Sequence, residues 1–264
     1  MYRGFELDIN DWDISNYHAQ GLKVFDFFKN KVTPVLDSYI KDNKALDGDA
    51  MRKDWFPEVE ADIFISHSHT DKDLAICLAG WLYKKFEIRA FIDSMVWNYA
   101  DDLLWEIDKN YCRPKGEKHF IYKLRNYSTS HVHMMLTASL NKMIDKCECF
   151  FFIKTPNSIT TQKAIEEAKT YSPWIYSEIE TSRIIRKKPL SVYRELSDSE
   201  VKLFSLSKQK FLNENLKIEY PLNTDHLEEI TEMELILWEK QFSSDPEKYP
   251  LDNLYYNHPL LKRL

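Results

Sequence analysis

The chain has 264 residues, of which 44% are hydrophobic and 30% charged, and its net charge is −6. This composition is ordinary for a globular protein, and the length is enough for one large domain or for one domain with an appendage. Because no basic stripe dominates, it gives no support to a nucleic-acid partner. The longest apolar runs fall far short of the ~20 residues of a membrane span, and the first residues lack the apolar core of a signal peptide. We therefore expect no membrane partner.

Two residue types narrow the chemistry further. The four cysteines lack the spacing of a zinc site or a disulfide framework, which predicts a reducing, cytoplasmic location. They are Cys77, Cys112, Cys147 and Cys149. The five glycines lie too far apart for a Gly-x-Gly-x-x-Gly or a Walker A loop. Any nucleotide must therefore be held in another way.

Short apolar runs alternate with stretches of helical spacing through the middle of the chain. Strands are predicted at 62–66, 88–93, 149–153 and 190–193, helices at 71–86, 99–111, 131–146 and 173–186, and a long polar surface loop at 112–130. This alternation predicts a parallel sheet covered by helices, and we expect a flavodoxin-like, three-layer α/β fold.

The two ends of the chain depart from this alternation. Residues 1–59 carry apolar side chains at helical spacing and predict an N-terminal helical extension. Beyond the core domain, which we place at 60–195, helices are predicted at 198–213 and 224–241, around a short extended piece at 217–222. Because both ends are amphipathic, we expect residues 196–264 to form a mainly helical extension that packs on the core domain.

The most informative run is Ser172-Pro-Trp-Ile-Tyr-Ser-Glu178. A hydroxyl cap followed by proline suits the start of a helix. Trp174 and Glu178 are four residues apart, so they share one helical face. Since this helix follows the buried strand at 149–153, Glu178 is expected near the sheet edge where α/β proteins bind ligands.

Two other segments converge on that edge. In a flavodoxin-like order, ligands bind outside the carboxyl ends of the two strands that flank the reversal of strand order. That crevice would be lined by Ser66-His-Ser-His-Thr-Asp71, by the loop from Asp93 to Tyr99 and by the helix that carries Glu178. The topology alone thus predicts one site built from three segments.

These three segments resemble a known family. Ala61-Asp-Ile-Phe-Ile-Ser-His-Ser-His-Thr-Asp71, Ala90-Phe-Ile-Asp93 and Trp174-x-x-x-Glu178 are similar to the first strand, second strand and catalytic helix of bacterial Toll/interleukin-1 receptor (TIR) domains. The resemblance covers roughly residues 60–195. It implies a flavodoxin-like fold and, in the enzymatic members, cleavage of the nicotinamide–ribose bond of NAD⁺. The position of the essential glutamate in those enzymes corresponds to Glu178.

The resemblance also implies a substrate site and an assembly surface. NAD⁺ would be the substrate, with no cofactor, and it would be contacted by Ser66, His67, Ser68, Asp93, Trp97, Tyr99, Ser172 and Trp174. In the family, the loop that corresponds to 94–101 gates the site and mediates self-association, which we expect here through Trp97. Stand-alone bacterial TIR proteins of this kind resemble the signal-generating enzymes of Thoeris-type antiphage systems, whose ADP-ribose-derived product activates a separate effector protein.

The residues leave other interpretations open. His67/His69 and His131/His133 form His-x-His pairs, but no third ligand is evident and we expect no metal. A non-catalytic TIR assembly module is one alternative, although the presence of Glu178 argues against it. Another is a nucleoside deoxyribosyltransferase-like enzyme, which shares the fold type and a glutamate acting at an anomeric carbon. The sequence argues against a receiver domain, because the first strand does not end in an acidic pair for Mg²⁺.

Overall fold

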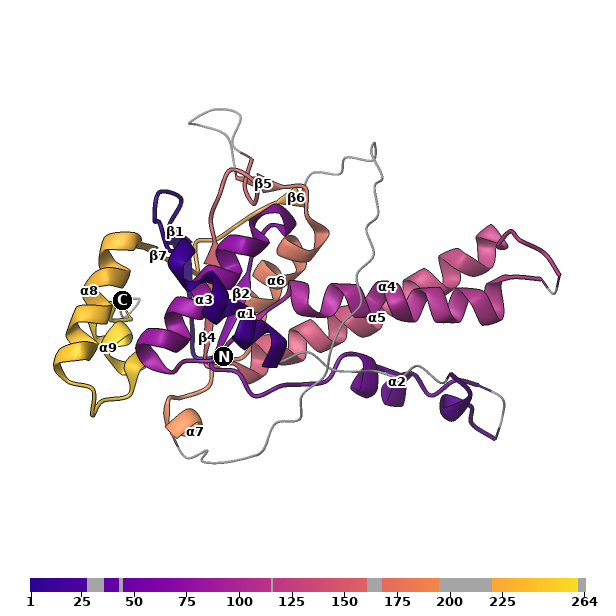
Figure 1. Cartoon of the computed structure of the whole chain (residues 1–264), viewed down its shortest axis with the longest axis horizontal. Helices are drawn as coiled ribbons and strands as arrows, with labels where there is room; N and C mark the ends of the chain where they lie inside the picture. The colour runs from indigo at the N-terminus through magenta and orange to yellow at the C-terminus, as the bar shows by residue number, and fades with distance from the viewer. Residues whose placement is uncertain (28–35, 43–44, 115, 161–167, 195–219, 261–264) are drawn as a thin grey trace.

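A five-stranded parallel sheet forms the centre of the molecule (Figure 1). The computed structural model describes residues 1–27, 36–42, 45–114, 116–160, 168–194 and 220–260, with the backbone alone at 95–98. In spatial order the strands are β3 (Ala90–Ile92), β2 (Ile63–Ser66), β4 (Cys149–Ile153), β1 (Arg3–Asp8) and β7 (Glu228–Thr231). The α/β class and the parallel sheet that the sequence predicts are confirmed.

Helices cover both faces of the sheet, and this explains why β2 and β4 are buried along their whole length. The chain moves in one direction across the sheet from β1 to β2 and on to β3, and in the other from β3 to β4 and on to β7. Because crossovers between parallel strands are right-handed, these two directions place helices on opposite faces. Accordingly, α1 (His18–Phe27) contacts α3 (Lys72–Phe86), and α5 (Tyr122–Lys146) contacts α6 (Pro173–Ile184).

The N-terminal segment is not purely helical, which corrects the prediction for residues 1–59. Its first residues form β1, between β4 and β7, with Phe5 opposite both Phe151 and Glu228. β2, β3 and β4 keep the order expected of a flavodoxin-like sheet, but the next two positions are taken by the first and last strands of the chain. Further along the segment, α1 and α2 (Gly48–Trp55) are helical, as predicted.

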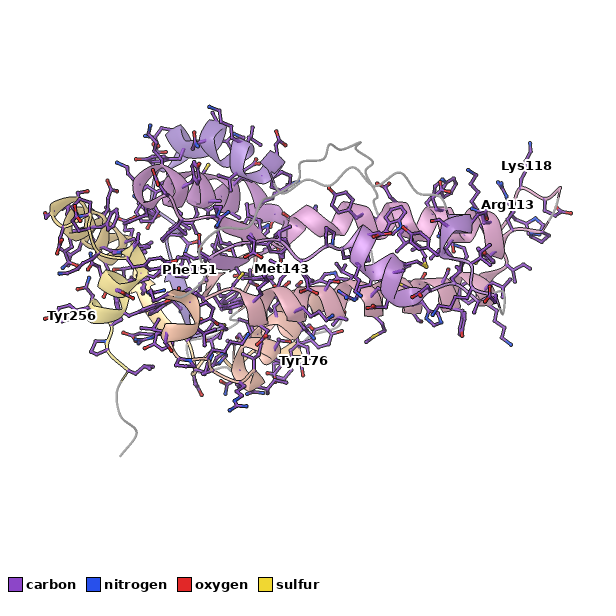
Figure 2. All side chains as sticks on the ribbon, turned by 90° about the horizontal axis from the view of Figure 1, so that it is seen from below. Arg113, Lys118, Met143, Phe151, Tyr176 and Tyr256 are labelled. Carbon is purple, nitrogen blue, oxygen red and sulfur yellow. The ribbon has the colours of Figure 1, made fainter. Side chains whose placement is uncertain are left out.

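A helical arm projects from the sheet (Figures 1 and 2). It consists of α4 (Ser94–Ile107), a π-helical turn (Asp108–Cys112), a connection at 113–121 and α5, with α2 packed alongside. The predicted loop at 94–101 is therefore wrong, because α4 begins at Ser94, whose N–H donates to the Asp93 carboxylate at 2.6 Å. The predicted loop at 112–130 is also too long, because α5 begins nine residues earlier than the helix predicted at 131–146.

The segment after α6 differs from the prediction in two places. Residues 190–193 do not form a strand, since α7 (Ser191–Arg194) is a short helix. The helix predicted at 224–241 begins later, at α8 (Glu232–Ser244), because β7 precedes it and a capping box of Thr231 and Glu234 starts the helix. The helix predicted at 198–213 lies outside the described residues. Part of the extended piece at 217–222 forms β6 (Tyr220–Pro221), which pairs with β5 (Lys169–Thr170).

The described part of the C-terminal segment packs on the central layers, as expected from its apolar spacing. Trp238 of α8 stacks on Phe86 of α3 with ring centroids 4.0 Å apart. Tyr255 of α9 (Pro250–Asn257) stacks on Phe5 of β1 at 6.3 Å. Both aromatic rings are almost fully buried. α8 and α9 therefore close one side of the core instead of extending from it.

Candidate functional site

Glu178 and Ser66 meet at the carboxyl end of the sheet. Ser66 is the last residue of β2, and its hydroxyl donates to Oε2 of Glu178 at 2.6 Å. α6 presents the glutamate in its second turn. The helix begins with Pro173, and the Ser172 hydroxyl accepts the N–H of Ile175 at 3.3 Å. Both Ser66 and Glu178 are buried, at 0% and 1% exposure. The convergence of these two segments that the topology predicts is therefore present.

The third predicted segment contributes a second carboxyl group. Asp93 follows β3, is fully buried, and its carboxyl group lies close enough to that of Glu178 for its charge to raise the pKa of Glu178. One oxygen of each group, Oδ2 of Asp93 and Oε1 of Glu178, is buried without a hydrogen-bond partner among the described residues. Two buried carboxyl groups side by side favour a state in which Glu178 is protonated, because two negative charges this close repel strongly.

This environment sets the protonation state of Glu178. Burial, and after it the charge of Asp93, raises the pKa of Glu178 well above its ordinary value, while the hydrogen bond from Ser66 opposes the rise. The closed arrangement therefore favours the neutral form of Glu178. A neutral carboxyl group can donate its proton to Asp93, and this accounts for the contact between the two acids.

His67 completes the buried group. Its Nδ1 lies 2.7 Å from Oδ1 of Asp93, and its side chain is 0% exposed. The same Asp93 oxygen accepts the N–H of Ser94. Asp93 thus links the loop after β2, the start of α4 and the glutamate of α6. We call Ser66, His67, Asp93 and Glu178 the carboxyl cluster.

A half-buried aromatic rim lies one turn before Glu178. The Trp174 ring meets the edge of His133 of α5 with centroids 5.6 Å apart and an interplanar angle of 78°. Burial lowers the pKa of His133, and the neighbouring Asp101 of α4 opposes this. In the sequence, His133 stands out only as half of a His-x-His pair, so its contact with Trp174 is not predictable from spacing.

Other predicted site residues lie outside the carboxyl cluster. Ser68 is hydrogen-bonded to Thr70 at 3.0 Å, and Ser172 caps α6, so both have structural partners. Tyr99 is buried within α4, whereas the side chain of Trp97 lies outside the described residues. Across the part of the chain that the structure describes, no group of three potential metal ligands converges.

A second polar network at the same sheet edge was not predicted. Asp71, at the end of the loop after β2, accepts hydrogen bonds from the Thr155 hydroxyl at 2.5 Å and from the Asn157 amide at 2.7 Å. Thr155 and Asn157 follow β4, so this network holds together the two loops that border the crevice. The Thr-Pro-Asn-Ser run at 155–158 signals a turn, but nothing in the sequence names Asp71 as its partner.

Two pockets of the described structure lie away from the carboxyl cluster. One of about 860 Å³ lies where β1 and β7 begin, at the opposite edge of the sheet, and is lined by Arg3, Lys187 and His226 among others. Another of about 440 Å³ lies between α2 and the arm and is largely apolar. Neither contains a residue of the carboxyl cluster.

Comparisons with known proteins leave the chain without an assigned relative. No protein-family description, no curated protein and no solved structure matches it. No helix in the described ranges combines the length and the hydrophobicity needed to cross a bilayer. The residues and the geometry of the site therefore carry what is known of its chemistry.

Proposed function

We propose that this chain is a TIR-like enzyme that cleaves NAD⁺ at the nicotinamide–ribose bond, with Glu178 as the catalytic carboxylate. The observation that supports this most directly is the carboxyl cluster at the point where the strand order reverses. There, Glu178 is joined to Ser66 and Asp93, residues of the two other segments that resemble the family.

The chemistry suits a single carboxylate. Nicotinamide is already cationic in NAD⁺, so it leaves as a neutral molecule without a general acid. The transition state instead develops positive charge on the ribose. A carboxylate held against the ribose in a site without bulk water stabilises that charge. Trp174, one turn away on the same helix face, is placed to pack against the ring or the sugar.

The closed arrangement must open before catalysis. Glu178 is 1% exposed, so no substrate reaches it without displacement of the side chains above it. Opening also changes its charge. Separation from Asp93 removes the main repulsion, and the cationic nicotinamide–ribose favours the ionised carboxylate. The described state is then a resting state in which Glu178 is neutral and inactive.

The proposal extends to the product. Hydrolysis gives ADP-ribose, whereas attack by another nucleophile held in the closed site gives a cyclic or conjugated form. We propose that the product is a signal read by a separate effector protein in antiphage defence, as in the Thoeris-type enzymes that the motifs resemble. Mass spectrometry of the products formed from NAD⁺ identifies which of these is made.

Replacement of Glu178 by Gln tests the role of the carboxylate. We expect a loss of roughly 100- to 1,000-fold in nicotinamide release, because one preorganised electrostatic group is removed while shape is kept. Glu180→Gln makes the same chemical change two positions further along α6 and should retain activity.

Equal rates for the two variants would contradict the proposal. A parent enzyme that leaves NAD⁺ intact but cleaves deoxynucleosides would instead favour a deoxyribosyltransferase-like reaction.

A further inference from the structure

The tip of the arm differs in charge from the rest of the chain. We define the arm tip as residues 109–127, which include the end of the π-helical turn, the connection and the start of α5. It holds six Lys and Arg residues and one Glu, a net charge of +5. Since the whole chain carries −6, the remainder carries −11. The modest net charge of the chain is therefore the sum of two regions whose net charges have opposite signs.

Three basic side chains of the arm tip are available for contact. Arg113, Lys118 and Lys123 are exposed and form no ion pair with a described residue, and Figure 2 shows Arg113 and Lys118 extending from the end of the arm. α5 has 25 residues and is therefore about 37 Å long. The Debye length at physiological salt is only about 8 Å. The negative charge of the body is thus largely screened at the tip.

Apolar side chains lie among these charges. Tyr122 is 80% exposed, Tyr127 68%, Tyr111 48% and Ile121 42%. Tyrosine is enriched at protein interfaces because its ring buries a large area while its hydroxyl keeps a hydrogen bond. A basic surface with protruding tyrosines on a narrow, projecting element is typical of a contact surface.

A complementary surface lies on the same protein. The acidic loop after β1, taken here as residues 8–13 and so including the last residue of the strand, contains three exposed carboxylates, Asp8, Asp11 and Asp13. None of them forms an ion pair with a described residue. In Figure 1 this loop, coloured indigo, is on the opposite side of the molecule from the arm tip. One copy therefore cannot bring its own tip and loop together.

We propose that the arm tip of one copy docks on the acidic loop after β1 of a second copy. The contact is head-to-tail, so each copy keeps a free tip at one end and a free loop at the other. Such heterologous contacts build rings or open filaments, not closed two-fold dimers. The loop lies at the carboxyl edge of the sheet, so each contact places the tip of one copy near the catalytic edge of the next.

Sedimentation velocity of the full chain tests this contact. We expect association that grows with protein concentration at 50 mM NaCl and weakens at 500 mM, as screening requires. Lys118→Glu combined with Lys123→Glu should raise the dissociation constant at least about tenfold, because two attractive charges become repulsive. Lys84→Glu combined with Lys240→Glu makes the same change in net charge at exposed sites elsewhere and should leave association intact.

A charge swap tests the pairing itself. Asp8→Lys combined with Asp11→Lys should abolish association when that variant is alone. Mixed with the Lys118→Glu/Lys123→Glu variant, it should associate again, since its unchanged basic tip then meets the unchanged acidic loop of the other variant. Circular dichroism and thermal melting check that each variant is folded.

Three results would overturn the proposal. They are a parent protein that is monomeric at every concentration, a control pair that dissociates as fully as the tip variant, and a mixture that stays monomeric. Binding of the tip to single-stranded DNA or to anionic vesicles, without self-association, would assign the surface to another partner. The readout is assembly alone, so it does not depend on whether the enzyme cleaves NAD⁺.

Discussion

At the scale of single residues, the contact between Asp93 and Glu178 is the feature with most consequences. A carboxyl group that is buried beside another acid ionises less readily in the folded state than in the unfolded state. At a pH where the unfolded chain is ionised, this difference lowers the free energy of unfolding. Proteins keep such arrangements mainly at functional sites, where perturbed pKa values serve the chemistry. The pair is therefore expected to affect stability and activity in opposite ways.

Glu178→Gln should stabilise the protein near pH 7. The pKa of Glu178 is higher in the folded state than in the unfolded state. The stability that protonated Glu178 gives the folded protein is therefore fully present below the unfolded-state pKa, and it is lost as pH rises through the folded-state pKa. Glutamine does not titrate, and its amide can donate to Asp93. We expect a gain on the order of 1 kcal/mol at pH 7, or roughly 2–4 °C in Tm. The gain should shrink toward pH 4, and a variant less stable than the parent at pH 7 would contradict this account.

In the NAD⁺ cleavage that we propose, Asp93→Asn should shift the pH dependence of the rate toward lower pH. The proposed reaction requires ionised Glu178, so its rate should rise as pH passes the pKa of this group. Removal of the Asp93 charge removes a cause that raises that pKa. Asparagine keeps the oxygen that accepts the N–H of Ser94.

The control is Asp102→Asn, which removes a carboxylate of α4 that is exposed and outside the carboxyl cluster. Its kcat/KM profile should match that of the parent. If the two variants give the same profile, the charge of Asp93 does not act on Glu178.

The sequence predicts where these residues meet better than it predicts what they do to one another. Ser66, Asp93 and Glu178 all follow strand ends or begin helices, so topology alone brings them to one edge. Whether Asp93 turns toward Glu178 or caps the next helix depends on angles that spacing does not encode, and it does both. The hydrogen bond between Asp71 and Thr155 likewise depends on the direction of the side chains, which spacing does not encode.

At the scale of elements, two glycines determine how closely α1 packs on α3. An added Cβ at Gly21 would lie 1.9 Å from the carbonyl oxygen of Ile76. At Gly80 it would lie 2.2 Å from the carbonyl oxygen of Tyr17. Both obstacles are backbone atoms, which cannot rotate away as a flexible side chain can. The helices therefore need glycine at this crossing.

Gly21→Ala should destabilise the protein although alanine favours helices. Over-packing of this kind costs roughly 1–3 kcal/mol, more than the ~1 kcal/mol gained in helix propensity. Gly48→Ala is the matched control, because the nearest atom to its added Cβ is the Met135 methyl at 3.8 Å. Urea denaturation should give a lower midpoint for the first variant alone. Equal midpoints would mean that α1 shifts on α3 without cost.

The elements that the sequence misplaces share a physical reason. β1 contains Arg3 and Glu6, charges that a buried strand does not ordinarily hold, and they are tolerated because Glu228 and Lys154 pair with them. The start of α5 is exposed all round, so it lacks the apolar face that marks a helix. Partners far away in the sequence therefore decide the first case, and the lack of a buried face explains the second. β2 and β4, whose apolar residues suffice for burial, are predicted almost to the residue.

At the scale of the whole molecule, the core crosses the boundary predicted at residue 60. β4 is covered by β1 on one side and β2 on the other. A fragment of residues 60–195 would therefore expose the open edge of β4 and the apolar surface that Phe5 and Leu7 bury. We expect that fragment to be insoluble or unfolded, in contrast to the full chain.

Expression of the fragment, followed by circular dichroism and limited proteolysis, measures this. A soluble, protease-resistant fragment would show that the ends of the chain are dispensable. A chain with residues 1–8 deleted lacks only β1 and can be compared directly with the fragment. Both proteins should fail to fold, because both leave the edge of β4 open.

The position of β1 also sets the order in which the protein can mature on the ribosome. Phe5 pairs with Phe151, 146 positions later, and with Glu228, 223 positions later. At translation rates of about 5–20 residues per second, the strand waits roughly 10–45 s for its last partner. Sheets completed by such distant pairings fold slowly and expose apolar surface meanwhile. The yield of native protein should therefore rise when synthesis is slowed at low temperature or when the host has more chaperone capacity. These conditions should affect the yield more than any local sequence change.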